Sequence, residues 1–174
     1  MKKEHGFTLL ELLVSIAIVG VVGTAATTVT FQSIKETQTS NDRMMVVQQD
    51  EDVSYSLSHD AEMAESIAVL SYPNLVEFTW TQWNLTNGSS VYYTVTYAFV
   101  NLTNGVGQLQ RTYQSSAGAD TQTTVCRYIY YNANDPNNTT SAMWQDPLLT
   151  VQMTSKVNST QETRVFQIVR RVNI

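Results

Sequence analysis

Hydrophobic residues are concentrated at one end of the chain. From Phe7 to Phe31 the sequence reads FTLLELLVSIAIVGVVGTAATTVTF, and Glu11 is the only charged residue in it. A helix rises about 1.5 Å per residue, so this segment can cross the roughly 30 Å of hydrocarbon in a bilayer. Lys2 and Lys3 precede it, and the positive-inside rule places that end in the cytoplasm. We therefore expect a single membrane pass with everything after Phe31 outside.

The helical pattern continues beyond the apolar segment. Six apolar residues recur at spacings of 7, 4, 4, 3 and 4, which places them on one helix face: Val46, Val53, Leu57, Ala61, Ala64 and Ala68. No proline occurs before Pro73. We predict one helix from about Phe7 to Ala68, roughly 90 Å long at 1.5 Å per residue, whose later part lies on a globular head.

From Tyr72 onward the period of the pattern changes to two, which is typical of strands. Six segments have strand composition and partial alternation: 75–83, 91–100, 107–113, 123–131, 148–157 and 163–172. Turn residues separate them at Asn87-Gly88, Asn104-Gly105, 115–120, 132–141 and Asn158-Ser159. The predicted fold class is therefore α+β, with the long N-terminal helix packed across an antiparallel sheet.

Composition narrows the possible functions. The 174 residues carry a formal charge of −5, and 14% of them are charged, where a soluble domain has about 25%. This balance argues against a nucleic-acid partner, which requires clustered Lys and Arg. A single cysteine, Cys126, excludes an internal disulfide, and two histidines exclude most zinc chemistry. We expect no cofactor and no metal.

The charge of Glu11 inside the apolar segment needs a reason. A carboxylate at the centre of a bilayer costs roughly 2.5–3.5 kcal/mol on insertion scales. A secretory signal would share the lysines and the apolar run, and Thr24–Thr28 weakly resembles its small-residue cleavage site. A plain signal anchor would share the same features. Neither of these alternatives accounts for the glutamate.

The residues around Glu11 supply that reason. Lys2-Lys3-Glu4-His5-Gly6 followed by Phe7-Thr8-Leu9-Leu10-Glu11 resembles the class III leader of bacterial type IV prepilins and pseudopilins. The resemblance implies that a prepilin peptidase cuts after Gly6, that Phe7 is N-methylated, and that Glu11 serves subunit assembly. Many type IV pilins carry a helix-loosening proline at the position of Thr28, and this chain lacks it.

The pairing logic of the motif rests on charge. Cleavage would create a positive amine at Phe7, and a paired charge enters apolar surroundings far more cheaply than a lone one. The resemblance implies that Glu11 pairs with the amine of a neighbouring subunit. Within one chain, Glu11 would also favour the positive end of its own helix, by about 0.3–1 kcal/mol. Both interpretations remain open at this point.

The body of the chain is also similar to a narrower branch, the J-type minor pseudopilins and W-type minor pilins. Five segments carry this similarity: 57–64, 95–97, 109–111, 127–131 and 169–171. Tyr97 followed by Leu109-Gln110-Arg111 would equally suit a hairpin whose exposed face carries the arginine. No C-terminal cysteine loop closes the head, as it does in many major pilins.

The remaining candidate chemistry is weak. His59 sits beside Asp60 on the predicted helix, where a solvated pair is expected, and no catalytic triad can be built. The run Asp50-Glu51-Asp52 is interpreted as a solvated face, because consecutive helical carboxylates diverge and calcium needs six to eight converging oxygens. Some aromatic residues could form a stacking surface for sugar or DNA, but aromatic residues that alternate on strands are more often core on one face and half-exposed on the other: Trp80, Trp83, Tyr92, Tyr93, Tyr130 and Tyr131. We expect no enzymatic activity.

The sequence thus predicts four segments: a cleaved leader (1–6), a membrane and filament-core helix (7–31), an amphipathic continuation (32–70) and a β-rich head (71–174). The implied function is that of a structural subunit, a minor one, of a type IV pilus, competence pilus or type II secretion pseudopilus. Its partners would be the prepilin peptidase/N-methyltransferase, other pilin or pseudopilin subunits, the inner-membrane assembly platform, and lipid before assembly. A membrane-tethered extracellular binding module is the alternative.

Overall fold

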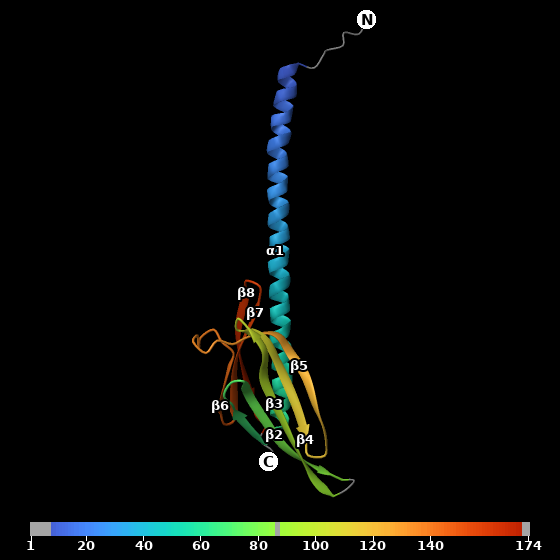
Figure 1. Ribbon diagram of the computed structural model, residues 1–174, viewed down its shortest axis with the longest axis vertical. Helices are drawn as coiled ribbons and strands as arrows, with labels where there is room; N and C mark the ends of the chain where they lie inside the picture. The colour runs from blue at the N-terminus through green and yellow to red at the C-terminus, as the bar shows by residue number, and fades with distance from the viewer. Residues whose placement is uncertain (1–7, 86–87, 172–174) are drawn as a thin grey trace. The chain divides into compact units, whose positions relative to one another are not determined.

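One helix and a set of antiparallel strands make up the described part of the chain. The computed structural model describes residues 8–85 and 88–171. Helix α1 runs from Leu9 to Met63. The strands are β1 (Ser66–Val69), β2 (Asn74–Asn84), β3 (Ser89–Thr103), β4 (Val106–Ser115), β5 (Gly118–Tyr130), β6 (Ser141–Gln145), β7 (Leu148–Val157) and β8 (Thr160–Val169). Figure 1 shows them in chain order by colour. The expected α+β class is confirmed.

The chain divides into two compact units, Met1–Asn41 and Asp42–Ile174. The described part of the first unit is the N-terminal portion of α1. The second unit contains the rest of α1 and all eight strands seen in the described residues. The side chains of the two units have different surroundings.

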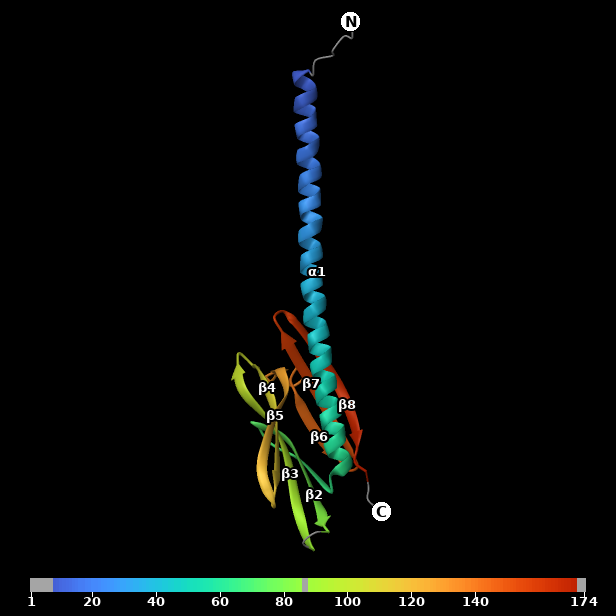
Figure 2. The same ribbon diagram turned by 90° about the vertical axis from the view of Figure 1, so that its right-hand side faces the viewer.

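In the second unit, one face of α1 forms the core contact. Val46, Val53, Leu57 and Ala61 are fully buried, as the spacing predicted. Val53, Leu57 and Ala61 belong to one core cluster with apolar side chains from the strands, among them Phe78, Val95, Leu109 and Met153. The sheet curls around this part of the helix, so strands on both of its sides reach the same apolar face (Figure 1, Figure 2).

All the strand pairs described in the sheet are antiparallel. The order is β1-β2-β3-β4-β5-β7-β6, with β8 paired to β7. Long hairpins join β2 to β3, β3 to β4, β4 to β5 and β7 to β8. The junction between β5 and β7 is narrow, because Ile129 and Ser155 form the one pair between them in the described register. The sheet therefore opens at this junction.

The helix ends earlier than predicted. It stops at Met63, where the sequence pattern extended it to about Ala68, and Ser66–Val69 forms β1 instead. In that strand Ile67 is buried and Ala68 is exposed, the reverse of the helical prediction. β1 pairs with β2 over its full length, from Ser66 opposite Thr79 to Val69 opposite Val76. Pairing to a long neighbouring strand outweighs the continuing helical spacing of the alanines.

Six predicted strands are present, and two further strands were missed. β1 is too short to show alternation, with four residues of which one is buried. β6 includes Ser141, the last residue of the segment interpreted as a turn, and forms a hairpin with β7 across Asp146-Pro147. Both strands gain their stability from pairing with a longer neighbour, which sequence composition does not display.

Three of the predicted turns use left-handed backbone, and one of them does so at Gly88 (φ 66°). Asn104 (φ 52°) and Gly105 (φ 80°) form the two-residue connection between β3 and β4, the combination that favours a tight hairpin. A Cβ on Gly105 would also lie 2.8 Å from the Tyr130 ring. Asn158 (φ 53°) plays the same part between β7 and β8. These turns fix the register of the sheet that faces α1.

Shortening one buried side chain of α1 should destabilise the second unit strongly. Leu57→Ala removes a fully buried side chain from the centre of the helix–sheet contact. We expect the free energy of unfolding to fall by about 2–5 kcal/mol, through lost transfer energy and the cavity left behind. Urea unfolding of the full chain in non-ionic detergent would measure it. Leu85→Ala is the matched control, because Leu85 is 90% exposed; an equal loss in both variants would contradict the assigned core.

Candidate functional site

The residues expected to be processed lie at the N-terminus. Gly6 and Phe7 fall outside the described residues, so their predicted cleavage and methylation stay predictions. Glu11 lies in the first turn of α1. The Thr8 backbone N–H and hydroxyl both donate to Glu11 Oε2 at 2.9 Å, and the Glu11 N–H donates to Thr8 Oγ1 at 3.3 Å. This reciprocal pair is a capping box, which satisfies donors at the start of the helix.

Among the described residues of the first unit, nothing covers the apolar part of α1. Most of its large side chains are more than half exposed, including Leu9, Leu13, Ile16, Val19 and Val22. An 18-residue window of this helix has a mean hydropathy of 2.3, and none of it is buried. Among the described residues, α1 is the one helix long and apolar enough to cross a membrane. A signal sequence near the N-terminus can have the same length and the same apolar composition.

Hydroxyl groups in this segment are satisfied by the helix itself. Ser15 donates to the Glu11 carbonyl, Thr27 to the Gly23 carbonyl, and Thr28 to the Thr24 carbonyl, at 2.7–2.9 Å. The helix is unbroken at Thr28, where many pilins carry proline. Because these hydroxyls need no outside partner, the segment presents an apolar surface to lipid or to other helices.

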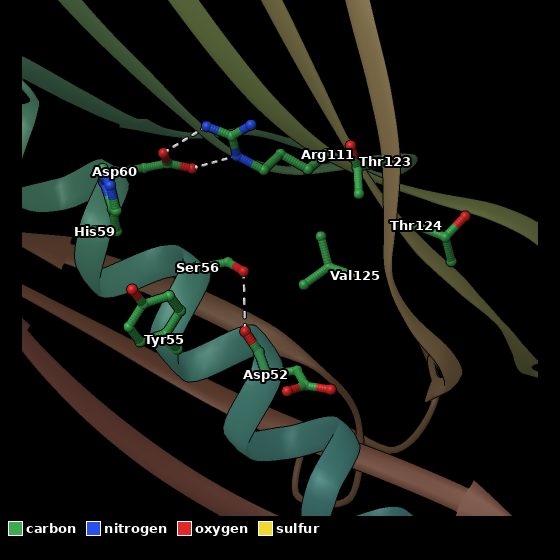
Figure 3. Close-up of a pocket in the computed structure, with 9 residues that line it drawn as sticks. All are labelled: Asp52, Tyr55, Ser56, His59, Asp60, Arg111, Thr123, Thr124 and Val125. Atoms are coloured by element: carbon green, nitrogen blue, oxygen red, sulfur yellow. Dashed lines mark hydrogen bonds and ion pairs between the residues drawn. The ribbon is translucent and has the colours of Figure 1, made fainter.

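In the second unit, Asp60 lies at the centre of a buried polar cluster. Its side chain is almost fully buried. Tyr97 Oη donates to Oδ2 at 2.6 Å, and Arg111 binds both carboxylate oxygens, with Nε 2.8 Å from Oδ2 and Nη2 2.7 Å from Oδ1. Figure 3 shows the guanidinium meeting the carboxylate from the strand side. These contacts join α1 to β3 and β4.

Two sequence interpretations are corrected by this cluster. Asp60 was expected to form a solvated pair with His59, and one of two open interpretations placed Arg111 on an exposed hairpin face. Instead Asp60 is buried against Arg111, whereas His59 is exposed. The hydrogen bonds to Asp60 raise the pKa of the Arg111 guanidinium, and burial raises the pKa of the Tyr97 phenol. Arg111 therefore stays charged and Tyr97 stays neutral, the states that this network requires.

A second buried carboxylate, Asp50, lies about one turn after Val46 on the strand-facing side of α1. The Ser155 hydroxyl donates to its Oδ1 at 2.6 Å. Its Oδ2 has no hydrogen-bond partner, and Arg164 Nε is 3.9 Å away. Burial raises the pKa of Asp50 to about 6, against the lowering effects of Ser155 and Arg164. The expected solvated face is thus wrong for Asp50, although Glu51 and Asp52 are exposed as expected.

Asp50 lies where the sheet opens. Ser155, its hydrogen-bond partner, is the β7 residue that pairs with Ile129 of β5. The neighbouring helix residue Gln49 accepts the backbone N–H of Arg127 of β5 through its Oε1, at 2.6 Å. Side chains of α1 therefore bind polar groups of both strands at the junction, and they replace part of the missing strand pairing.

A cleft of about 400 Å³ lies beside the Asp60 cluster (Figure 3). Its walls are the helix between Asp52 and Asp60 and the strand residues Arg111 and Thr123–Val125. The Ser56 hydroxyl donates to the Asp52 carbonyl at 2.9 Å, so it is engaged with its own helix.

One further titratable group, the thiol of Cys126, is buried. Burial raises the pKa of the Cys126 thiol to about 11, which keeps it protonated and unreactive near neutral pH. In residues 8–85 and 88–171, no group of three or more His, Cys, Asp or Glu side chains could hold a metal ion.

Sequence reasoning missed the buried roles of both carboxylates, although a signal was present. Asp50 lies four residues after Val46 and three before Val53, and Asp60 lies three after Leu57. Both positions belong to the helix face that the apolar spacing had already identified. A charged residue on a predicted core face indicates a partner on the opposite strands, and Arg111 was available as one.

Removing the charge partner of Asp60 should destabilise the second unit. Arg111→Met keeps most of the side-chain volume but leaves a buried carboxylate without its cation, and we expect a loss of about 3–5 kcal/mol in the free energy of unfolding. The double variant Asp60→Leu/Arg111→Met should lose less than Arg111→Met, because it buries no unpaired charge. Urea unfolding compares them. A double variant at least as unstable as Arg111→Met would contradict this explanation.

Asp50 should make stability depend on pH. Its pKa is about 6 in the folded chain and about 3.9 when unfolded, so the folded state holds the proton more tightly. Stability contributed by this proton is fully present below about pH 4 and is lost as the pH rises through 6, by about 2–3 kcal/mol in total. Asp50→Asn should flatten this part of the stability profile measured by urea unfolding between pH 4 and 8. Asp52→Asn, at an exposed position, is the control; a profile unchanged by Asp50→Asn would refute the assignment.

Comparison with known proteins gives one match, at the N-terminus. Residues 1–27 match the family described as the prokaryotic N-terminal methylation motif. The comparisons with curated proteins and with solved structures gave no match. The motif implies processing by a prepilin peptidase and assembly with other pilins. Together with the long apolar α1 and the antiparallel sheet, it shows that this chain carries the prokaryotic N-terminal methylation motif, consistent with the class III leader of a type IV pilin or pseudopilin.

Proposed function

We propose that the chain is a minor filament subunit that is cleaved after Gly6, methylated at Phe7 and assembled through the apolar part of α1. The observation that carries this proposal is the methylation motif on a helix whose apolar side chains are exposed. The motif by itself supports a type IV pilin-like or pseudopilin subunit. The proposal adds the processing site, the assembly surface and the minor role.

The exposed apolar side chains of α1 would be covered first by lipid and then, after assembly, by helices of other subunits. Fully burying one Leu, Ile or Val contributes about 1.5–3 kcal/mol, so a helix with this many exposed apolar residues is stable only in lipid or among other helices. Lipid would cover the segment before assembly, with the N-terminus in the cytoplasm. Equivalent helices of other subunits would cover it afterwards, when the inner-membrane assembly platform moves the chain into the filament.

Gly20 and Gly23 support close helix packing in this segment. A Cβ added at either position would meet nothing within 4 Å, so the surface there is open. The hollow is bordered by Val19, Thr24 and Phe31. Small residues let the backbones of neighbouring helices approach, which is how apolar helices associate where water provides no driving force.

The Glu11 carboxylate accepts hydrogen bonds within the free chain and would have a different partner in the assembled filament. In the free chain Thr8 holds the carboxylate at the helix start. In the filament, the methylated amine of Phe7 on an adjacent subunit would take its place as the partner of the carboxylate. The capping box keeps the charge oriented at the helix end until that amine arrives.

Replacing Glu11 by Gln tests the assembly role. An unpaired amine in apolar surroundings would cost about 3–5 kcal/mol, which lowers incorporation at least 100-fold, since each 1.4 kcal/mol is tenfold. The measurement is the share of the Glu11→Gln chain in sheared fibres, after intact mass has shown cleavage behind Gly6.

Thr8→Ala is the matched control, because it breaks the capping box and keeps the charge of Glu11. A lost cap costs about 0.5–2 kcal/mol, so this variant should incorporate much better than Glu11→Gln. Normal incorporation of cleaved Glu11→Gln, or equal defects in both variants, would leave Glu11 as a helix-end charge only.

The minor role rests on the second unit. Its connections at 116–117 and 131–140 contain one charged residue, Asp135. The segments at 57–64, 95–97 and 109–111 resemble the J-type and W-type branch of minor subunits. An initiating subunit can expose one face outward, whereas an abundant one must contact neighbours around its whole circumference. A type IV pilus, a competence pilus and a type II secretion pseudopilus all use such subunits.

Copy number distinguishes the minor role from the major one. Quantitative mass spectrometry of purified fibres should find this chain at a small fraction of the commonest subunit. Peptides from β3 and β7 suit the measurement, because both strands lie in the second unit and survive processing at Gly6. Parity with the commonest subunit would make this chain the major pilin.

The alternative function is a membrane-tethered binding module, in which α1 is only an anchor. The observation that favours it is the same exposed apolar helix, which lipid alone can cover. A tether needs no cleavage after Gly6 and stays with the membrane. A subunit loses residues 1–6 and leaves with the fibres.

A further inference from the structure

The sheet has an outward surface that the core does not use. On β2, β3 and β4, alternate residues such as Phe78 and Val95 are buried against α1. The residues between them alternate with this buried set and face away from α1. In Figure 1 these strands lie in front of the helix. Trp83 and Tyr92 belong to this outward set, and they are 61% and 64% exposed.

These two aromatic rings are close neighbours on the outward surface. In the register of β2 and β3, Thr81 pairs with Tyr92 and Trp83 pairs with Ser90. Trp83 and Tyr92 are therefore diagonal neighbours on one face, at about 7–8 Å between backbone positions. By contrast, Trp80 and Tyr93 stack on each other on the inner face, with ring centroids 5.5 Å apart. Trp80 and Tyr93 therefore pack in or against the core on the inner face. Trp83 and Tyr92 are exposed on the outer face, as the alternation along the strands predicted.

The backbone of Tyr92 is fixed by two hydrogen bonds. Its N–H donates to the Ser116 hydroxyl at 3.0 Å, and the Ser116 N–H donates to the Tyr92 carbonyl at 2.9 Å. These bonds join β3 to the turn between β4 and β5. A fixed backbone reduces the conformational entropy that is lost when a ligand stacks on the side chain.

Planar polar groups lie on the same surface. Gln114 pairs with Thr94, the next outward residue after Tyr92 on β3. Its Nε2 donates to Asp120 Oδ2 at 3.0 Å, so the amide and the carboxylate form a fixed and exposed pair. The remaining amide and carboxylate oxygens accept hydrogen bonds, and the second amide hydrogen donates. Such a pair can bind adjacent hydroxyl groups of one ligand.

The charge of this surface excludes anionic ligands. β2, β3 and β4 contain two charged residues, Glu77 and Arg111, and Arg111 faces inward to Asp60. With Asp120, the outward surface around the two rings carries carboxylates and no cation to neutralise a phosphate, sulfate or uronate. Nucleic acid, lipid headgroups and acidic polymers therefore fit poorly. A neutral ligand rich in hydroxyl groups, with apolar ring faces, fits both the aromatic rings and the polar pair.

We propose that the outward surface around Trp83 and Tyr92 binds a neutral polysaccharide. The two aromatic rings stack on the apolar faces of sugar rings, and Gln114 and Asp120 bind hydroxyl groups along the same chain. This binding needs no filament, so it stands or fails independently of the proposed assembly.

The test is a titration of the full chain with defined oligosaccharides. The chain is kept in a polyoxyethylene detergent, because a detergent with a sugar headgroup would compete. The probes are cellohexaose and chitohexaose, which are neutral, and hexagalacturonate, which is anionic. Calorimetry and Trp fluorescence should show saturable binding of a neutral hexasaccharide and none of hexagalacturonate.

Variants locate the site. Trp83→Ala and Tyr92→Ala should each weaken binding about tenfold or more, as loss of a central aromatic contact does. Leu85→Ala is the matched control, because Leu85 is apolar, 90% exposed and in the same hairpin. Unchanged urea midpoints in all three would show that folding is intact.

Several results would overturn the proposal. They are no binding of either neutral hexasaccharide, stronger binding of hexagalacturonate, and equal binding by the wild type and both aromatic variants. If Trp83→Ala instead reduces incorporation into fibres and leaves sugar binding unchanged, the surface is a contact between subunits and the proposal is wrong.

Discussion

The packing of one narrow face of α1 into the curled sheet is the interaction on which the second unit depends. Four fully buried residues, Val46, Val53, Leu57 and Ala61, recur along this face, and the strands reach them from both sides of the helix. Two carboxylates extend the same face. Asp60 bonds to β3 and β4, and Asp50 bonds to β7, so each ties the helix to a different part of the sheet.

The two carboxylates differ in how well they are satisfied. Asp60 receives three hydrogen bonds from a tyrosine and an arginine, which offset the cost of burying its charge. Asp50 receives one strong bond and has an oxygen without a hydrogen-bond partner, so its proton is held to higher pH. Asp60 therefore fixes the register between helix and sheet, whereas Asp50 makes the junction of β5 and β7 sensitive to acidity. A purely apolar face would provide neither.

The first unit differs in that its apolar side chains are exposed. Among its described residues nothing covers these side chains, and hydroxyl groups such as those of Thr27 and Thr28 donate to carbonyls of their own helix. Only lipid or other helices can cover such a surface. The methylation motif at residues 1–27 and this surface therefore point to the same use of the segment, as membrane anchor and assembly element.

The local patterns made much of the fold predictable. The spacing from Val46 to Ala61 identified the core face, and Asn104-Gly105 identified a hairpin. What depends on pairing between distant segments was not predictable: β1 and β6 form because β2 and β7 are there to pair with them. The buried role of Asp60 was not predicted for the same reason, since its partners Tyr97 and Arg111 are 37 and 51 residues away in the sequence. The motif around Glu11 was readable because it is local and contiguous.

The most direct test of the account is the intact mass of the chain recovered from sheared fibres, compared with the chain that remains in the membrane. The account predicts that fibres contain a chain starting at N-methylated Phe7, without residues 1–6. Gly6→Val should keep the chain in the membrane with its leader attached. A chain in the fibres that still begins at Met1, or a processed chain found only in the membrane fraction, would contradict the assignment as a filament subunit.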